Sequence, residues 1–107
     1  MTAPQDTENN LRFEWDEEKN KINIKKHGLD FADASEIFLG PMLVALDERE
    51  EYGEDRWIGI GMLKTRTVVV LYTEREENVI RIISLRKATS DEQKRYEEFL
   101  KDELGEG

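Results

Sequence analysis

Alternating apolar and polar side chains predict five short strands along the chain. In the first, at residues 12–15, Phe13 and Trp15 point to one side and Glu14 to the other. Four further runs rich in β-branched and aromatic residues follow; they occupy residues 42–47, 55–63, 67–73 and 78–85. The segments between these four runs have the length of hairpin loops, so consecutive strands are expected to run antiparallel.

Capping residues on either side of a charged segment predict a first helix at residues 17–27. Asp16 has the position of an N-cap and Gly28 that of a C-terminal stop, and the segment is acidic at its start and basic at its end. Ile22 and Ile24 are the main apolar residues available to dock this helix. The solvated side is expected to be a polar stripe that contains Lys19, Asn23 and Lys26 or His27.

Two further helices are predicted from apolar residues that recur at helical spacing. A short one begins after Asp30 and ends before Gly40; its apolar residues are Phe31, Ala34, Ile37 and Phe38. The last begins near Thr89 or Ser90, where residues 90–93 have the spacing of a capping box; its apolar side is Tyr96, Phe99, Leu100 and Leu104.

The order of these elements, β-α-α-β-β-β-β-α, predicts an α+β fold. Two helices precede a small antiparallel meander of four strands and one helix follows it, so we expect the helices to pack on the sheet. A chain of 107 residues supplies a single hydrophobic core. One domain is therefore expected at residues 12–104, after a flexible tail at residues 1–11.

Composition excludes several kinds of site. The chain has no cysteine, which removes disulfides, thiolate zinc sites and cysteine nucleophiles. No segment has the pattern of a signal peptide or the length of a membrane span, so a cytoplasmic location is expected. We find no phosphate-binding glycine loop, metal-ligand spacing or nucleophile elbow, and we expect no cofactor. Gly59 and Gly61 lie inside a strand and are expected to mark the close approach of another element.

Charge is distributed unevenly along the chain. The net charge is −9, which by itself argues against nucleic-acid binding. Residues 56–87, however, carry 7 basic and 3 acidic side chains, in the part of the chain that is most clearly predicted as sheet. A basic sheet surface inside an acidic protein can hold an anion. For that anion to be RNA, the acidic stretches 47–55 and 91–106 have to face away from it.

Arginines on the predicted strands are candidates for phosphate binding, and they are Arg56, Arg75, Arg81 and Arg86. Each can equally pair with one of the abundant carboxylates. Arg81 is the strongest candidate because it lies between Ile80 and Ile82, where an unpaired guanidinium would be costly if buried. Regular pleating places Arg81 and Arg86 on opposite faces, so the two can share a site only if the strand ends or bulges before Arg86.

The single histidine, His27, ends the first predicted helix. Imidazole exchanges protons near neutral pH, which makes His27 a candidate for proton transfer. The alternative interpretation is a cationic residue that stabilises the helix C-terminus. Metal binding is disfavoured because the chain has neither a second histidine nor a cysteine.

Several of these residues belong to motifs that resemble the BrnT family of bacterial toxins. Two motifs carry most of the resemblance: W-D-x-x-K-x-x-x-N-x-x-K-H-G at residues 15–28 and R-I-I-S-x-R at residues 81–86. The other matching positions are Phe13, Glu14, Phe31, Ala34, Phe38, Asp47, Glu54, Arg56, Tyr72, Thr73, Glu74, Arg75, Ile80, Lys87, Ala88, Glu92 and Tyr96. The resemblance extends from about Arg12 to Tyr96.

The resemblance implies a RelE-like fold and a ribonuclease that arrests translation by cutting RNA. It also implies a partner encoded in the same operon, the antitoxin BrnA, which binds the toxin in a hetero-oligomer. The antitoxin carries the DNA-binding part of that complex, so DNA is expected to be contacted only through the partner.

The reaction expected from this resemblance is metal-free transesterification. A base takes the proton of the 2′-OH, that oxygen attacks the neighbouring phosphate, and an acid protonates the leaving 5′-oxygen. The residues expected to be catalytic are His27 or Glu54, in proton transfer, and Arg81 with Arg56 or Arg75, on the phosphate. Those expected to bind substrate are Lys26, Arg75, Ser84, Arg86 and Tyr96.

Two other functions are compatible with the sequence. A catalytically inactive interaction module that binds an antitoxin-like protein is favoured by the negative net charge, whereas the matches at polar positions of the family disfavour it. A transcriptional regulator that acts on DNA directly is disfavoured because no predicted helix has a basic face and the last helix is acidic.

Overall fold

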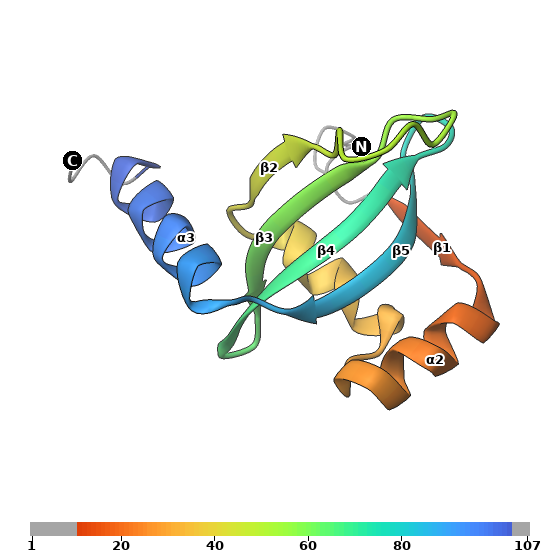
Figure 1. Ribbon diagram of the computed structural model, residues 1–107, viewed down its shortest axis with the longest axis horizontal. Coiled ribbons are helices and arrows are strands. Elements are labelled where there is room, and N and C mark those ends of the chain that lie inside the picture. Colours follow the sequence, from red (N-terminus) through yellow and green to blue (C-terminus); the bar gives the residue numbers. More distant parts are fainter. Residues whose placement is uncertain (1–10, 104–107) are drawn as a thin grey trace, which may run out of the picture.

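The structure, a computed structural model, describes residues 11–103. It contains one five-stranded sheet with helices on both faces, and the predicted α+β class is confirmed (Figure 1). The predicted flexible tail, except for Leu11, and the predicted core residue Leu104 lie outside the described residues.

The strands follow the predicted positions closely, and their order in the sheet is β1-β5-β4-β3-β2. Their bounds are β1 Arg12–Trp15, β2 Leu43–Leu46, β3 Trp57–Leu63, β4 Arg66–Glu74 and β5 Val79–Lys87. The last four form the predicted antiparallel meander. The sheet as a whole is mixed, however, because β1 pairs in parallel with β5. Two helices separate β1 from the meander, and a connection of that length removes the constraint that makes hairpin strands antiparallel.

The first helix, α2 (Glu17–His27), has the predicted bounds and caps. The carboxylate of Asp16 accepts hydrogen bonds from the backbone N–H groups of Glu18 and Lys19. At the other end, Gly28 adopts a left-handed conformation with φ of 72° and donates its N–H to the carbonyl of Ile24. Local sequence therefore determines both ends of α2.

The second helix, η1 (Phe31–Leu39), is a 3-10 helix rather than the expected α-helix. Its three buried residues, Phe31, Ala34 and Ile37, are spaced by three, which is the repeat of a 3-10 helix and aligns their side chains along one edge. That edge packs on the sheet over Gly61, where an added Cβ would come within 2.7 Å of the Ile37 side chain. The predicted close approach over the strand glycines is confirmed.

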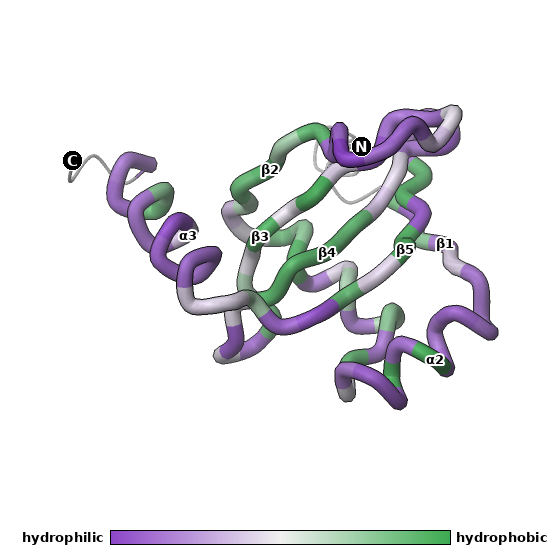
Figure 2. Tube along the Cα trace, viewed as in Figure 1, coloured by the Kyte–Doolittle hydropathy of each residue, from purple (hydrophilic) through white to green (hydrophobic). Residues whose placement is uncertain are grey.

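The two faces of the sheet carry separate clusters of buried side chains. Between η1 and the sheet, the larger cluster comprises Leu29, Phe31, Ala34, Ile37, Leu63, Val68, Val70, Tyr72, Ile80, Ile82 and Leu85. On the other face, Tyr96 of α3 (Ser90–Glu103) packs with Ile60 and Val69 at one end of the sheet. Helix α3 leaves most of that face uncovered, because it extends beyond the strands (Figure 1). The helix is mainly hydrophilic (Figure 2).

Helix α2 docks through two asparagines, which contradicts the prediction from its apolar residues. Ile22 and Ile24 are 63% and 40% exposed, whereas Asn20 and Asn23, the latter placed on the expected solvated stripe, are buried. Asn20 accepts the N–H of Phe31 and donates to the Asp30 carboxylate. The backbone N–H that Ala32 donates to this carboxylate, and the bond from Asn20, hold the pKa of Asp30 below its usual value.

Asn23 completes the edge of β5 where β1 no longer covers it. Strand β1 pairs with Val79 to Ile82 only, so the next residues of β5 have no strand neighbour on that side. The Asn23 amide donates to the carbonyls of Leu85 (2.8 Å) and Leu29 (3.0 Å), and its oxygen accepts the N–H of Leu85 (3.2 Å). A side chain therefore replaces a strand partner at Leu85.

Replacement of Asn23 by Ala is expected to destabilise the protein by about 2 to 3 kcal/mol, because it leaves buried backbone groups of Leu85 and Leu29 without partners. Replacement of the exposed Ile22 by Ala is the control and should change stability by less than about 0.5 kcal/mol. Urea unfolding of both variants measures the difference. A larger loss at Ile22 would show that the apolar residues dock the helix after all.

Candidate functional site

A β-bulge in β5 brings two of the candidate arginines, Arg81 and Arg86, to one face of the sheet. The register against β4 shifts by one residue: Leu71 pairs with Ser84, and Tyr72 pairs with Ile82. Ile83 is therefore an extra residue in β5, and the alternation of side chains reverses across it. As a result Arg81, Ser84 and Arg86 share the face opposite η1. The condition for Arg81 and Arg86 to lie on one side, a bulge before position 86, is met.

Three of these arginines and one glutamate surround a common hollow of about 190 Å³. We call it the arginine hollow; its polar lining residues are Asp16, Lys19, Glu54, Arg56, Arg75 and Arg81. They come from four places in the chain: the start of α2, the loop before β3, the turn between β4 and β5, and β5 itself. The structure thus brings together four of the nine residues expected at the site, Glu54, Arg56, Arg75 and Arg81.

Each arginine of the hollow is held by a carboxylate. Arg81 donates to Glu14 at 3.0 Å, and Arg75 approaches the same carboxylate oxygen at 3.9 Å. Arg56 pairs with Glu54 at 3.1 Å. Together with Asp16, Glu14 and Glu54 supply three carboxylates against four cationic side chains, since Lys19 also lines the hollow. The hollow keeps a positive balance inside an acidic protein.

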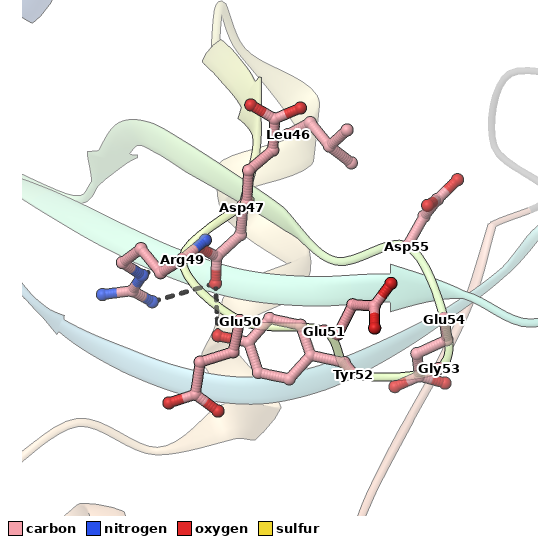
Figure 3. Close-up of a pocket in the computed structure, with 10 residues that line it drawn as sticks. Leu46, Asp47, Arg49, Glu50, Glu51, Tyr52, Gly53, Glu54 and Asp55 are labelled. Atoms are coloured by element: carbon pink, nitrogen blue, oxygen red, sulfur yellow. Dashed lines mark hydrogen bonds and ion pairs between the residues drawn. The ribbon is translucent and has the colours of Figure 1, made fainter.

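In the loop between β2 and β3, a buried carboxylate binds Arg49 and Tyr52 (Figure 3), and the ring of Tyr52 in turn contacts Arg56. The side chain of Asp47 is fully buried and accepts two hydrogen bonds from the guanidinium of Arg49, at 2.7 and 2.9 Å. The hydroxyl of Tyr52 donates to Asp47 at 3.0 Å, and the guanidinium of Arg56 lies 4.1 Å from the centre of the Tyr52 ring. Hydrogen bonds from Arg49 hold the pKa of Asp47 far below its usual value.

The same loop encloses a larger hollow, of about 750 Å³, that does not suit an anion. Its lining is the continuous segment 46–55, which contains six carboxylates and one arginine. One of these carboxylates, Glu54, also lines the arginine hollow, where it pairs with Arg56. We therefore do not place a phosphate in the larger hollow.

His27 does not lie in the arginine hollow. It lines a second hollow, of about 490 Å³, at the other end of α2, together with Lys26, Arg86, Lys87 and Thr89. We call this the lysine hollow. The expectation that His27 and Arg81 act on the same phosphate is therefore not supported by their positions. The arginine hollow lies beside the start of α2, whereas His27 ends this helix, which is about 16 Å long.

Arg86 forms an ion pair with Glu92, and Glu92 also caps the last helix. The guanidinium donates two hydrogen bonds of 2.9 Å to the two carboxylate oxygens. One of those oxygens accepts the backbone N–H of Thr89, and the Thr89 hydroxyl accepts the N–H of Glu92. The capping box therefore spans Thr89 to Glu92, one residue earlier than predicted. The hydrogen bonds from Arg86 lower the pKa of Glu92 to about 2.

Tyr96, which we expect from the resemblance to bind substrate, lies in the interior of the protein. The side chain is 2% exposed within the cluster on the α3 face, and its hydroxyl donates to the carbonyl of Pro41 at 2.9 Å. Burial raises the pKa of this hydroxyl. Tyr96 instead connects α3 to the segment before β2, and Ser84 is the remaining candidate on the open face of the sheet.

Three polar residues at the arginine hollow are not among the expected site residues. The sequence predicts Lys19 on a solvated helix stripe, Asp16 as a helix cap and Glu14 as the polar residue of the first strand. All three follow from one fact that the sequence did not reveal, the parallel pairing of β1 with β5, which places Glu14 beside Arg81 and starts α2 next to Ile83.

Neither a metal centre nor a membrane span is found in the described part of the chain. Within residues 11–103, no three His, Cys, Asp or Glu side chains are grouped as metal ligands. No helix in this range is both long and apolar enough to cross a membrane.

Comparison with protein families gives a match over residues 15–92, to the family described as the ribonuclease toxin, BrnT, of type II toxin-antitoxin systems. This range covers β1 from Trp15, the rest of the sheet and the start of α3. The chain belongs to the BrnT family. The residues that line both hollows lie within the matched range, whereas Tyr96 lies beyond it.

A solved BrnT structure supports the same assignment. The chain is 32% identical to the ribonuclease toxin BrnT of Brucella abortus, with a TM-score of 0.62. The alignment covers 75% of this chain and 99% of the Brucella chain. A search of curated proteins found no match. As a BrnT family member, the chain is a type II toxin, and such a system includes a protein antitoxin.

The pairing of Glu92 predicts how stability depends on pH. Because its pKa is lowered on folding, to about 2, the ionised Glu92 stabilises the fold above pH 4.5, and this contribution is lost progressively as the pH falls towards 2. Glu92→Gln should therefore cost about 2 kcal/mol at pH 7 and much less near pH 2. Thermal unfolding across this range measures the effect, with the exposed Glu98→Gln as control. An equal cost at both ends of the range would exclude the charge of Glu92 as the cause.

Proposed function

We propose that this chain is an active endoribonuclease toxin that cuts RNA at the arginine hollow by metal-free transesterification and so inhibits translation. The observation that supports the proposal is the convergence of Arg56, Arg75 and Arg81 with Glu54 on one hollow of about 190 Å³. Guanidinium groups on several sides of one space suit a phosphodiester, whose charge grows as the reaction proceeds.

The reaction follows from the chemistry of these groups. Glu54 takes the proton of the 2′-OH, and the oxygen attacks the adjacent phosphorus to form a 2′,3′-cyclic phosphate. The bond from phosphorus to the 5′-oxygen breaks, and a proton from Lys19 neutralises the leaving oxygen. Arg81 and Arg75 hold the non-bridging oxygens, and Arg56 both contacts the phosphate and holds Glu54. DNA is not cut because it lacks the attacking hydroxyl.

His27 and Lys26 have no place in this chemistry, since they lie in the other hollow. Arg86 is bound to Glu92 in two hydrogen bonds, which leaves it a supporting role. We assign Ser84 a contact with RNA next to the scissile phosphate; its position on the same face as Arg81 supports this assignment. A RelE-like fold, a cytoplasmic location and binding of a BrnA-type antitoxin in a hetero-oligomer, with DNA contacted only through that antitoxin, remain part of the proposal.

Replacement of Arg81 by Ala should lower RNA cleavage by about 10²- to 10³-fold, because the transition state then has one donor fewer. Cleavage by the unmodified protein should persist in EDTA. The matched control is Arg95→Ala, an exposed arginine of α3 outside the arginine hollow. Gel analysis of end-labelled RNA measures the rates, and circular dichroism confirms folding. Cleavage that stops with chelation would contradict the metal-free mechanism.

The alternative function, an inactive module that binds an antitoxin, predicts a different outcome in cells. We expect induction of the chain to arrest bacterial growth and degrade RNA, and we expect co-expression of its antitoxin, or the Arg81→Ala substitution, to restore growth. Growth curves and RNA integrity are the measurements. Tight antitoxin binding with no cleavage of varied RNAs would favour the inactive module.

A further inference from the structure

The lysine hollow has no role in the reaction, yet its surface is positive. Its lining contains Lys26, His27, Arg86, Lys87 and Thr89, and no acidic residue. Among the ion pairs of residues 11–103, one joins Arg86 to Glu92, while none includes Lys26 or Lys87. In a chain of net charge −9, two lysines in one hollow without carboxylate partners require an explanation.

The two hollows lie at the two ends of the contact between α2 and β5, which we call the seam. Helix α2 begins next to Ile83 and contributes Lys19 to the arginine hollow. It then passes Leu85, where Asn23 is bonded, and ends with Lys26 and His27 at the lysine hollow. Strand β5 runs in the same direction and contributes Arg81 to the first hollow and Lys87 to the second.

The β-bulge brings an arginine of each hollow to the same face of β5, whereas Lys87 follows Arg86 at the end of the strand, on the other side. Because Ile83 is an extra residue, Arg81, Ser84 and Arg86 point to the same side of β5. Arg86 lies about five strand positions after Arg81, which corresponds to about 15 Å. A few nucleotides of extended single strand cover this length, and the cationic groups at both ends match the charges of its backbone.

We propose that the lysine hollow is a second phosphate subsite, which binds the backbone of the same RNA a few nucleotides from the phosphate in the arginine hollow. Lys26 and Lys87 supply the positive charge that binds the phosphate. Arg86 keeps its two hydrogen bonds to Glu92 and lines the hollow. The inference depends on the proposed function. It adds that the substrate is single-stranded RNA longer than a dinucleotide, laid along α2 and β5.

The test compares the binding of 2′-O-methylated RNA of two lengths, a dinucleotide and a hexanucleotide, because this modification blocks cleavage. The double variant Lys26→Gln/Lys87→Gln should weaken hexanucleotide binding roughly tenfold more than dinucleotide binding. The magnitude of the slope of log K against log salt should decrease by about 0.7 for each phosphate that the variant no longer neutralises, as for single strands. Fluorescence anisotropy at several salt concentrations provides both measurements.

Lys25→Gln is the matched control, since Lys25 is an exposed neighbour on α2 that does not line the hollow. It should leave the difference between the two lengths unchanged. If Lys25→Gln weakened hexanucleotide binding as strongly as the double variant, the loss of net charge would explain the result, and the subsite would be overturned. An equal weakening on both lengths for the double variant would also overturn it, because both lysines would then act at the arginine hollow.

The experiments distinguish failure of the proposed function from failure of the second subsite. If the unmodified protein cuts unmodified RNA but the double variant binds both lengths as well as the control does, only the second subsite is wrong. If the unmodified protein neither binds nor cuts RNA, the proposed function fails and the inference fails with it. Thermal unfolding of the double variant checks that the two exposed lysines can be replaced without loss of folding.

Discussion

The pairing of one side-chain amide, that of Asn23, with the backbone of Leu85 determines how α2 docks on the sheet. Asn23 satisfies both the N–H and the carbonyl of Leu85, and it does so from α2, sixty-two residues away in the chain. A donor and an acceptor engaged at the same backbone residue fix both the position and the orientation of the helix. All groups that α2 contributes to either hollow depend on this alignment.

Sequence reasoning succeeded where structure is determined locally. Asp16 and Gly28 indicated the ends of α2 because each cap acts on backbone groups within a few residues. The hairpin strands followed from their composition and short connections. The prediction about the docking face of α2 was wrong, because periodicity assumes that apolar side chains dock a helix. The unsatisfied backbone of Leu85, which makes a buried asparagine favourable, exists only after β1 has ended at Trp15.

The site was predicted in part for the same reason. Arginine is readily recognised as a phosphate ligand, so Arg56, Arg75 and Arg81 were identified from residue type, from their places on the predicted strands and from motifs of the family. Their convergence depends on how β3, β4 and β5 pair, which residue type does not reveal. Whether Arg86 shares the face of Arg81 depends on an extra residue at position 83, and a continuous apolar run conceals such an insertion. Tyr96 and His27 matched the family pattern, but no feature of the sequence separates a side chain that packs, or lies elsewhere, from one that contacts substrate.

The carboxylate of Glu14, shared by Arg75 and Arg81, affects how the arginine hollow binds an anion. Both guanidinium groups have an internal partner within the fold, so part of the entropy of ordering them is lost on folding and not on association. An incoming phosphodiester has to compete with an internal anion rather than meet a bare cationic surface. Selectivity among anions is then governed by this exchange, in which a ligand with more oxygens in the right geometry displaces one with fewer.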